Sequence, residues 1–169
     1  MNHEGIQGAL VSHGSSTVPR YIVEEINALG GNIQNAYGIS KEELKAAIPC
    51  GIGKINVDTD IRLAVTRNFR ELFRDHPELK NDPKAGGVWK LLDEKRDAFD
   101  PRAFLAPIMD TVMYGTGDEG AVARITDAMR RGVKEAVGTL IVEFGSYGKA
   151  PLVEPATLED MAARYAKEG

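Results

Sequence analysis

The chain has 169 residues, of which 43% are hydrophobic and 27% are charged, as in an ordinary single globular domain. Its formal net charge of −4 is spread over interspersed acidic and basic residues, which argues against a nucleic-acid partner. The sequence has no apolar run of about 20 residues that could span a membrane and no charged-then-apolar leader, and Cys50 is its only cysteine. We therefore expect a cytoplasmic protein that binds neither nucleic acid nor a membrane.

The first predicted element is a buried strand over residues 8–13 (GALVSH), a short apolar run that ends in a polar residue. A helix follows, with Pro19 in its first turn and the glycine pair at residues 30–31 after its end. Apolar residues recur in this helix at helical spacing and predict its buried face: Ile22, Val23, Ile26 and Leu29.

A second strand is predicted over residues 52–57 (IGKINV), after a short helix over residues 41–48 that opens on a capping box at Ser40. Asp58-Thr59-Asp60 is then predicted to cap a long helix that ends near His76. Its expected core positions are Ile61, Leu63, Ala64, Val65, Phe69, Leu72 and Phe73. Because a crossover of this length joins the two strands, we expect them to be parallel neighbours.

The rest of the chain is predicted to be mainly helical, with turns at residues 81–83 and 86–87. The expected helices cover residues 88–97, 100–112, 121–143 and 156–166, with a loop over residues 114–120. Residues 114–143 suggest no function.

Polar segments follow both predicted strands, His13-Gly14-Ser15-Ser16 after the first and Asn56 to Asp60 after the second. Parallel strands end at one edge, and each segment leads into a helix N-terminus, where unpaired N–H groups attract a phosphate. Gly14 allows a close approach of the backbone, while Ser16 and Thr59 offer hydroxyl donors, and His13 is a candidate metal ligand. An ordinary turn with helix caps and a hydrogen-bonded histidine fit the same residues, so both interpretations stay open on spacing alone.

These motifs resemble those of the class II, zinc-dependent fructose-1,6-bisphosphate aldolases, in particular the Calvin-cycle-type branch. The resemblance covers HGSSTVP at residues 13–19, the stretch over 36–64, FDPRAFL at 99–105 and EDMAARYAK at 159–167. It implies an α/β fold, the C-terminal part of a TIM (β/α)8 barrel with a helical extension. Residues 1–80 would hold about the last two βα units, with the phosphate and zinc motifs, and residues 81–169 the mostly helical extension, in a single incomplete domain.

The resemblance implies reversible cleavage of fructose 1,6-bisphosphate to dihydroxyacetone phosphate and glyceraldehyde 3-phosphate, a step of glycolysis, gluconeogenesis and the Calvin cycle. His13 resembles one of three histidines that hold the catalytic Zn²⁺. Arg102 resembles the arginine that holds the distal phosphate of this phosphorylated sugar substrate. The expected contacts to the dihydroxyacetone phosphate part are Gly14, Ser16, Asn56, Asp58 and Thr59.

Family members are longer, and the first six strands, the other two zinc histidines and the acid–base aspartate would lie outside this chain. We therefore expect no catalytic residue here and no activity of this zinc-dependent aldehyde-lyase from the isolated chain. Asp75-His76 and His3 are interpreted as surface residues rather than substitute ligands. Full-length family members are homo-oligomeric, so we expect self-association and exposed apolar surface around both strands. The alternatives are a tagatose-bisphosphate-type class II aldolase and a non-catalytic, phosphate-binding partial barrel.

Overall fold

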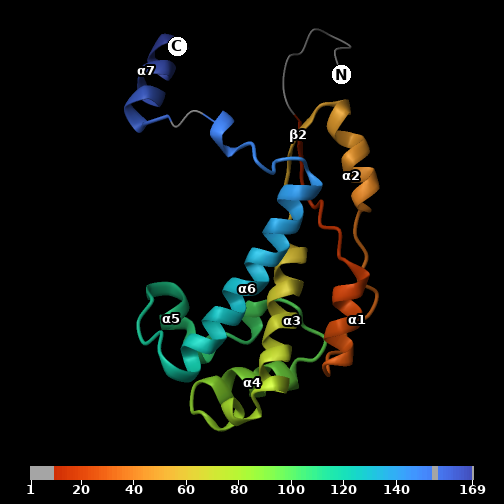
Figure 1. Cartoon of the computed structure of the whole chain (residues 1–169), viewed down its shortest axis with the longest axis vertical. Helices are drawn as coiled ribbons and strands as arrows, with labels where there is room; N and C mark the ends of the chain where they lie inside the picture. Colours follow the sequence, from red (N-terminus) through yellow and green to blue (C-terminus); the bar gives the residue numbers. More distant parts are fainter. Residues whose placement is uncertain (1–9, 154–155, 169) are drawn as a thin grey trace.

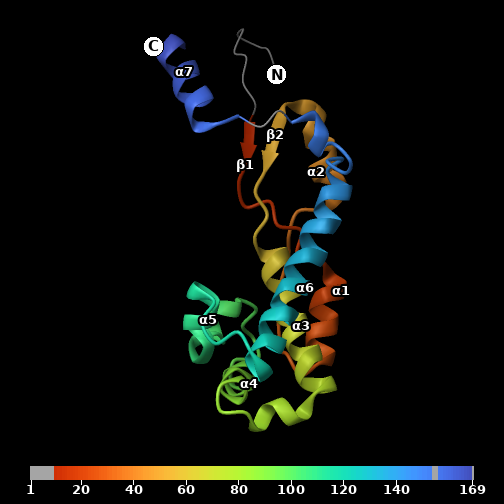
Figure 2. The same cartoon turned by 60° about the vertical axis from the view of Figure 1, so that its left-hand side comes forward.

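The computed structural model describes residues 10–153 and 156–168, which are mostly helical and contain one small parallel sheet (Figure 1, Figure 2). Strands β1 (Leu10–Ser12) and β2 (Ile52–Ile55) pair in parallel, with Ser12 opposite Ile55, which confirms the predicted neighbours. β2 is shorter than predicted and β1 ends one residue earlier than predicted, while residues 8 and 9 of the predicted first strand lie outside the described residues. Leu10 and Val11 are exposed, as expected of a sheet with an uncovered face.

The crossover between the strands contains helices α1 (Arg20–Ala28) and α2 (Lys41–Ala47) and the 3-10 turn η1 (Ile48–Cys50). The predicted capping box is present, because the Ser40 hydroxyl accepts from the Glu43 N–H while the Glu43 carboxylate accepts from the Ser40 N–H. Pro19 is predicted to lie in the first turn of α1. The structure instead places it one position earlier, as the N-cap, with a ψ of 119°.

The core lies around α3 (Thr59–Asp75), which packs along α6 (Gly120–Glu143) and also against α1 (Figure 1). The buried face of α3 is confirmed apart from Ile61, which is only partly buried. Phe69 and Phe73 are fully buried, and each such side chain contributes about 1.5–3 kcal/mol through the hydrophobic effect. Because α3 follows β2 directly, this core fixes the position of the strand ends.

The helix predicted over residues 88–97 is α4 (Ala85–Glu94), which follows the 3-10 turn η2 (Pro77–Asn81) and includes both glycines once expected in a turn. The Asp82 carboxylate starts this helix by accepting from the N–H groups of Lys84 and Ala85. Gly86 lies against the Lys80 carbonyl oxygen, which would be 2.3 Å from an added Cβ. Gly86 and Gly87 therefore allow α4 to pack closely against Lys80 and Pro107 and do not form a turn.

The prediction of one helix over residues 100–112 is wrong. The segment forms two 3-10 turns, η3 (Pro101–Ala103) and η4 (Ala106–Ile108), before helix α5 (Met109–Tyr114). Pro107 contributes to the difference, since it has no N–H to donate to a carbonyl oxygen of the preceding turn.

Beyond α6, the 3-10 turn η5 (Ala150–Leu152) leads to the terminal helix α7 (Leu158–Glu168), which lies away from the helical core (Figure 1, Figure 2). Among the described residues, no helix is both long and apolar enough to cross a membrane.

Gly132 is expected to be essential for the close packing of α6 on α3. A Cβ at this position would lie 2.7 Å from Val65 Cα and 2.8 Å from Val65 N, so Gly132→Ala should lower the free energy of unfolding by about 1–3 kcal/mol. Gly138, on the same helix, has no neighbouring atom within 4 Å of such a Cβ, so Gly138→Ala should instead raise it by up to about 1 kcal/mol. Urea denaturation measures both, and equal effects would contradict the packing.

Candidate phosphate-binding site

The segments that follow β1 and β2 stay paired beyond the sheet. The Asn56 N–H donates to the Ser12 carbonyl oxygen at 2.9 Å, and the Ser15 N–H donates to the Asn56 carbonyl oxygen at 3.3 Å. The two segments thereby form an open hollow of about 530 Å³, lined by Gly14, Ser16, Ile55, Asn56, Val57, Asp58 and Thr59. All five residues predicted to contact dihydroxyacetone phosphate are in this list.

Ser16 joins the first segment to the start of α3. Its hydroxyl oxygen accepts from the N–H groups of Asp58, at 3.2 Å, and Thr59, at 3.0 Å. Asp58, in the predicted Asp58-Thr59-Asp60 cap, is the N-cap residue of α3, but its side chain forms no capping hydrogen bond, and a serine 42 residues earlier supplies the capping oxygen. The Ser16 hydroxyl hydrogen remains available as a donor.

The hollow contains further donors. Among the described residues, neither the Gly14 N–H nor the Thr59 hydroxyl has a hydrogen-bond partner. Gly14 has a φ of +65° and open space around its Cα, so the backbone can approach a bound group closely. Unpaired donors beside the N-terminus of a 17-residue helix are suited to an anion.

Asp58 contributes its backbone to the hollow, while its carboxylate turns toward Arg62. The Arg62 Nε donates to Asp58 Oδ1 at 2.8 Å, and Arg62 Nη1 donates to Asp100 Oδ2 at 2.7 Å. This arginine offsets a negative charge that would otherwise repel an anion in the hollow.

Arg102 does not line the hollow. Its side chain is 72% exposed and pairs with Asp100, which also binds Arg62, so a chain of ion pairs connects it to Asp58. Hydrogen bonds from Arg102 are the main reason that the pKa of Asp100 lies below its usual value, and the carboxylate in turn raises the pKa of Arg102. In this arrangement Arg102 is held at the edge of the site rather than inside it.

His13 is exposed and lies next to Asn56. Its Nδ1 is 3.0 Å from the Asn56 amide nitrogen, which always donates, so Nδ1 accepts. His13 thus has one ring nitrogen held by a residue of the second segment and the other, Nε2, facing away from that bond.

The described residues do not form a zinc site. They contain no group of three or more His, Cys, Asp or Glu side chains that could hold a metal ion, and a catalytic zinc usually takes three protein ligands. Asp75 pairs with Arg74 and His76 with Glu78 on the surface, in agreement with their interpretation as surface residues, and His3 lies outside the described residues. His13, the predicted ligand, does not line the hollow itself but contacts Asn56, which does.

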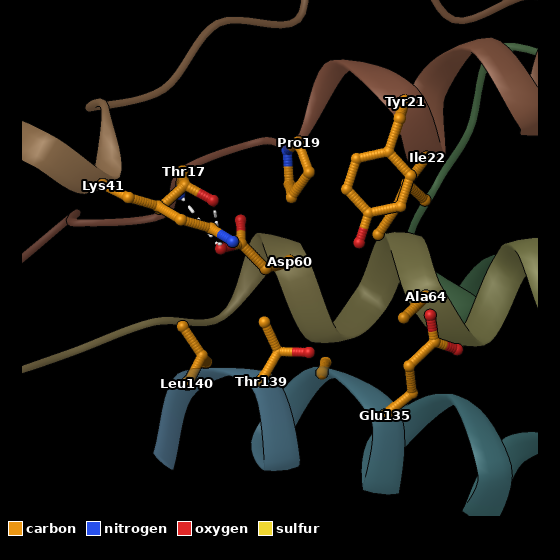
Figure 3. Close-up of a pocket in the computed structure, with 11 residues that line it drawn as sticks. Thr17, Pro19, Tyr21, Ile22, Lys41, Asp60, Ala64, Glu135, Thr139 and Leu140 are labelled. Atoms are coloured by element: carbon orange, nitrogen blue, oxygen red, sulfur yellow. Dashed lines mark hydrogen bonds between the residues drawn. The ribbon is translucent and has the colours of Figure 1, made fainter. Parts of the chain in front are cut away.

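Asp60, which the sequence presented only as part of a helix cap, is a buried structural residue next to the candidate site. It is 4% exposed, and its carboxylate accepts from the Thr17 N–H and the Thr17 hydroxyl at 3.1 and 2.8 Å (Figure 3). It also accepts from the Val18 N–H at 2.8 Å. These bonds hold Val18 at a φ of +48°, an unfavourable value for a β-branched residue. The position of Asp60, two residues after Asp58 in the same motif, was the one signal in the sequence for this role. The burial of its carboxylate could not be predicted from the sequence.

Asp60 also lies on the wall of a cavity of about 20 Å³ between α1, α3 and α6 (Figure 3). This space holds no more than about one water molecule. Through its hydrogen bonds to Thr17 and Val18, Asp60 holds the segment before α1 against the start of α3.

The chain belongs to the class II fructose-bisphosphate aldolase family, because the family's sequence profile, described as "Fructose-bisphosphate aldolase class-II", matches residues 3–149. A "Fructose-bisphosphate aldolase" from Xanthobacter flavus is 36% identical over 93% of this chain and 33% of the relative. A "Fructose-bisphosphate aldolase class 2" from Synechocystis sp. is 34% identical over 94% of this chain and 33% of the relative. A "Fructose-bisphosphate aldolase" from Thermus caldophilus is 35% identical over 86% of this chain and 34% of the relative. The chain thus spans about a third of the length of the curated relatives it matches.

Proposed function

We propose that this chain supplies the dihydroxyacetone phosphate side of a class II fructose-bisphosphate aldolase, which cleaves fructose 1,6-bisphosphate reversibly. The observation that carries this proposal is the hollow at the paired strand ends. There the Gly14 N–H and the hydroxyls of Ser16 and Thr59 are available beside the N-terminus of α3. These donors suit one phosphate of the substrate and would hold its carbon chain in a fixed orientation.

The proposed fold of the complete enzyme is a (β/α)8 barrel in which β1 and β2 are the last two strands. Parallel pairing, the uncovered apolar side chains of β1 and the match to a third of each relative support this placement. In such barrels the loops after the seventh and eighth strands commonly bind phosphate. The proposed location is the cytoplasm, which suits a chain whose single cysteine, Cys50, is a free thiol.

His13 is proposed to supply one ligand of the zinc ion on which the class depends, with the other ligands coming from the preceding part of the enzyme. The described residues alone do not fit the ion. With Nδ1 accepting from Asn56, the neutral ring carries its proton on Nε2, so zinc binding through Nε2 would require Nδ1 to carry the proton instead and to donate to the Asn56 amide oxygen after the amide turns over.

A non-catalytic phosphate-binding role is the second candidate. It is favoured by the presence of a single histidine, His13, beside the hollow and by the lack of a metal-binding group among the described residues. It shares the phosphate site but predicts no cleavage even when the preceding barrel strands are supplied.

A substitution at Arg102 tests whether this residue binds the distal phosphate of the proposed substrate. In an enzyme made by joining this chain to the preceding part of the Xanthobacter flavus relative, we expect cleavage of fructose 1,6-bisphosphate. Arg102→Ala should lower kcat/KM for this cleavage about 10- to 100-fold, as expected for a lost charge-assisted hydrogen bond of about 1.5–3 kcal/mol. Proton exchange on dihydroxyacetone phosphate, which lacks the distal phosphate, should change little. Equal losses in both reactions would show that Arg102 is structural, and no cleavage by the parent enzyme would favour the non-catalytic candidate.

A further inference from the structure

The segment just before α2 packs directly against the segment that follows β1. Gly38 has no room for a side chain, because a Cβ there would lie 2.4 Å from the Ser16 carbonyl oxygen and 2.4 Å from the Thr17 carbonyl carbon. The next residue, Ile39, donates its N–H to the Ser16 carbonyl oxygen at 3.1 Å. Backbone atoms cannot rotate away as the end of a flexible side chain can, so only a glycine permits this approach.

Ser16 is the residue through which this contact reaches the hollow. Its hydroxyl oxygen accepts from the N–H groups of Asp58 and Thr59, and its carbonyl oxygen accepts from Ile39, so both of its oxygen atoms are held. Ser16 lines the hollow, whereas Gly38 and Ile39 do not. The contact therefore fixes the position of a lining residue from behind.

The segment before α2 is itself anchored at both ends. On one side, the Ile33 N–H donates to the Asn27 side-chain oxygen at 2.8 Å, and the Asn27 amide donates to the Ile33 carbonyl oxygen at 2.9 Å. On the other side, Ser40 begins α2 with its capping box, and Lys41 of α2 forms an ion pair with Glu143 at the end of α6. The segment can therefore act as a firm support for the residues it contacts.

We propose that Gly38 is a positioning residue for phosphate binding, which acts by setting the place of Ser16 through the close contact of the two backbones. This proposal rests on the proposed function of the hollow. A Cβ contact shorter than 3.0 Å requires something to shift. Gly38→Ala should therefore move one of the two backbones by more than about 0.5 Å, the tolerance within which a binding group must be held.

Titration of the full chain with dihydroxyacetone phosphate, followed by NMR, tests this role. Gly38→Ala should raise the Kd at least about 10-fold, since a misplacement of about 1 Å can cost a site about 10²-fold. Gly86→Ala is the matched control, because its Cβ would lie 2.3 Å from the Lys80 carbonyl oxygen. Gly86 belongs to α4, at the end of α3 away from the strands (Figure 1), so this variant should keep the original Kd. Circular dichroism checks that both variants are folded.

A double-mutant cycle separates positioning from a general loss of stability. In a Ser16→Ala background, where the serine hydroxyl is absent, Gly38→Ala should change the Kd by less than about 3-fold, because the two substitutions act on one group. A second measurement needs no substitution and decides the question if Gly38→Ala does not fold. In the unmodified chain the Ile39 amide signal should shift with dihydroxyacetone phosphate, while the amide of Leu44, within α2, should not.

Three results would overturn the positioning role while leaving the proposed function intact. They are an unchanged Kd in Gly38→Ala, an equal loss of affinity in Gly86→Ala or in the Ser16→Ala background, and an Ile39 amide that does not respond to the bound ligand. If the unmodified chain itself does not bind dihydroxyacetone phosphate, the proposed function fails and the positioning role with it.

Discussion

The isolated chain should neither retain zinc nor cleave fructose 1,6-bisphosphate. Among the described residues His13 is the one histidine next to the proposed site, beside Asn56, and the described residues include no group of three potential metal ligands. A single imidazole would leave the ion mostly hydrated. The chain is also expected to lack the acid–base carboxylate, and a positioned group of that kind contributes about 10²–10⁴-fold in rate.

Metal analysis after desalting measures the bound zinc, and a coupled assay measures the cleavage of fructose 1,6-bisphosphate. The isolated chain should show no stoichiometric zinc, while the joined enzyme described above should contain zinc and be active. In the joined enzyme His13→Ala should lose the metal and the activity, and the matched control His76→Ala, at an exposed surface position, should keep both. One tightly bound zinc per isolated chain with measurable cleavage would contradict the expectation.

Asp60→Ala should produce the largest loss of stability among the substitutions near the site. The buried carboxylate accepts three hydrogen bonds from Thr17 and Val18, and its removal leaves two backbone N–H groups without their partner. Hydrogen bonds to charged groups and unsatisfied buried donors each account for about 1–3 kcal/mol, so we expect a loss of about 3 kcal/mol in the free energy of unfolding. The strained φ of Val18 should also relax, which would move Gly14 and Ser16.

Asp58→Ala is the matched control for this prediction, since the two carboxylates lie two residues apart at the start of α3. The Asp58 side chain is exposed and forms an ion pair with Arg62, so its loss should cost less than about 1 kcal/mol. Urea denaturation compares the two variants. Similar losses in both would show that Asp60 does not anchor the segment before α1.

Most secondary structure could be predicted because its signals are local. The Ser40 capping box, the apolar face of α3 and the parallel strands follow from spacing and turn residues, and they agree with the structure except at Ile61. The errors arose where distant contacts outweigh local preference. Gly86 is tolerated within α4 because it packs against Lys80, and Pro107 divides a segment whose spacing suggested one helix.

The candidate site was predictable to the extent that chain topology determines it. Parallel strands bring the segments after β1 and β2 together, so Gly14 and Thr59 could be placed at one edge in advance. The roles of Ser16 as the cap of α3 and of Asp60 as a buried anchor depend on contacts across more than 40 residues of sequence. Such contacts have no local pattern, because any serine or aspartate near a helix start resembles an ordinary cap.

An NMR titration of the isolated chain with dihydroxyacetone phosphate, compared with dihydroxyacetone, tests the central claim that the paired strand ends bind a phosphate. The amide signals of Gly14, Ser16 and Thr59 should shift with the phosphate-bearing ligand and not with dihydroxyacetone. Thr59→Val should weaken this binding by about 1–3 kcal/mol, and Thr59→Ser, which keeps the hydroxyl, should preserve it. Shifts that are absent from these amides, or that both ligands cause equally, would contradict the claim.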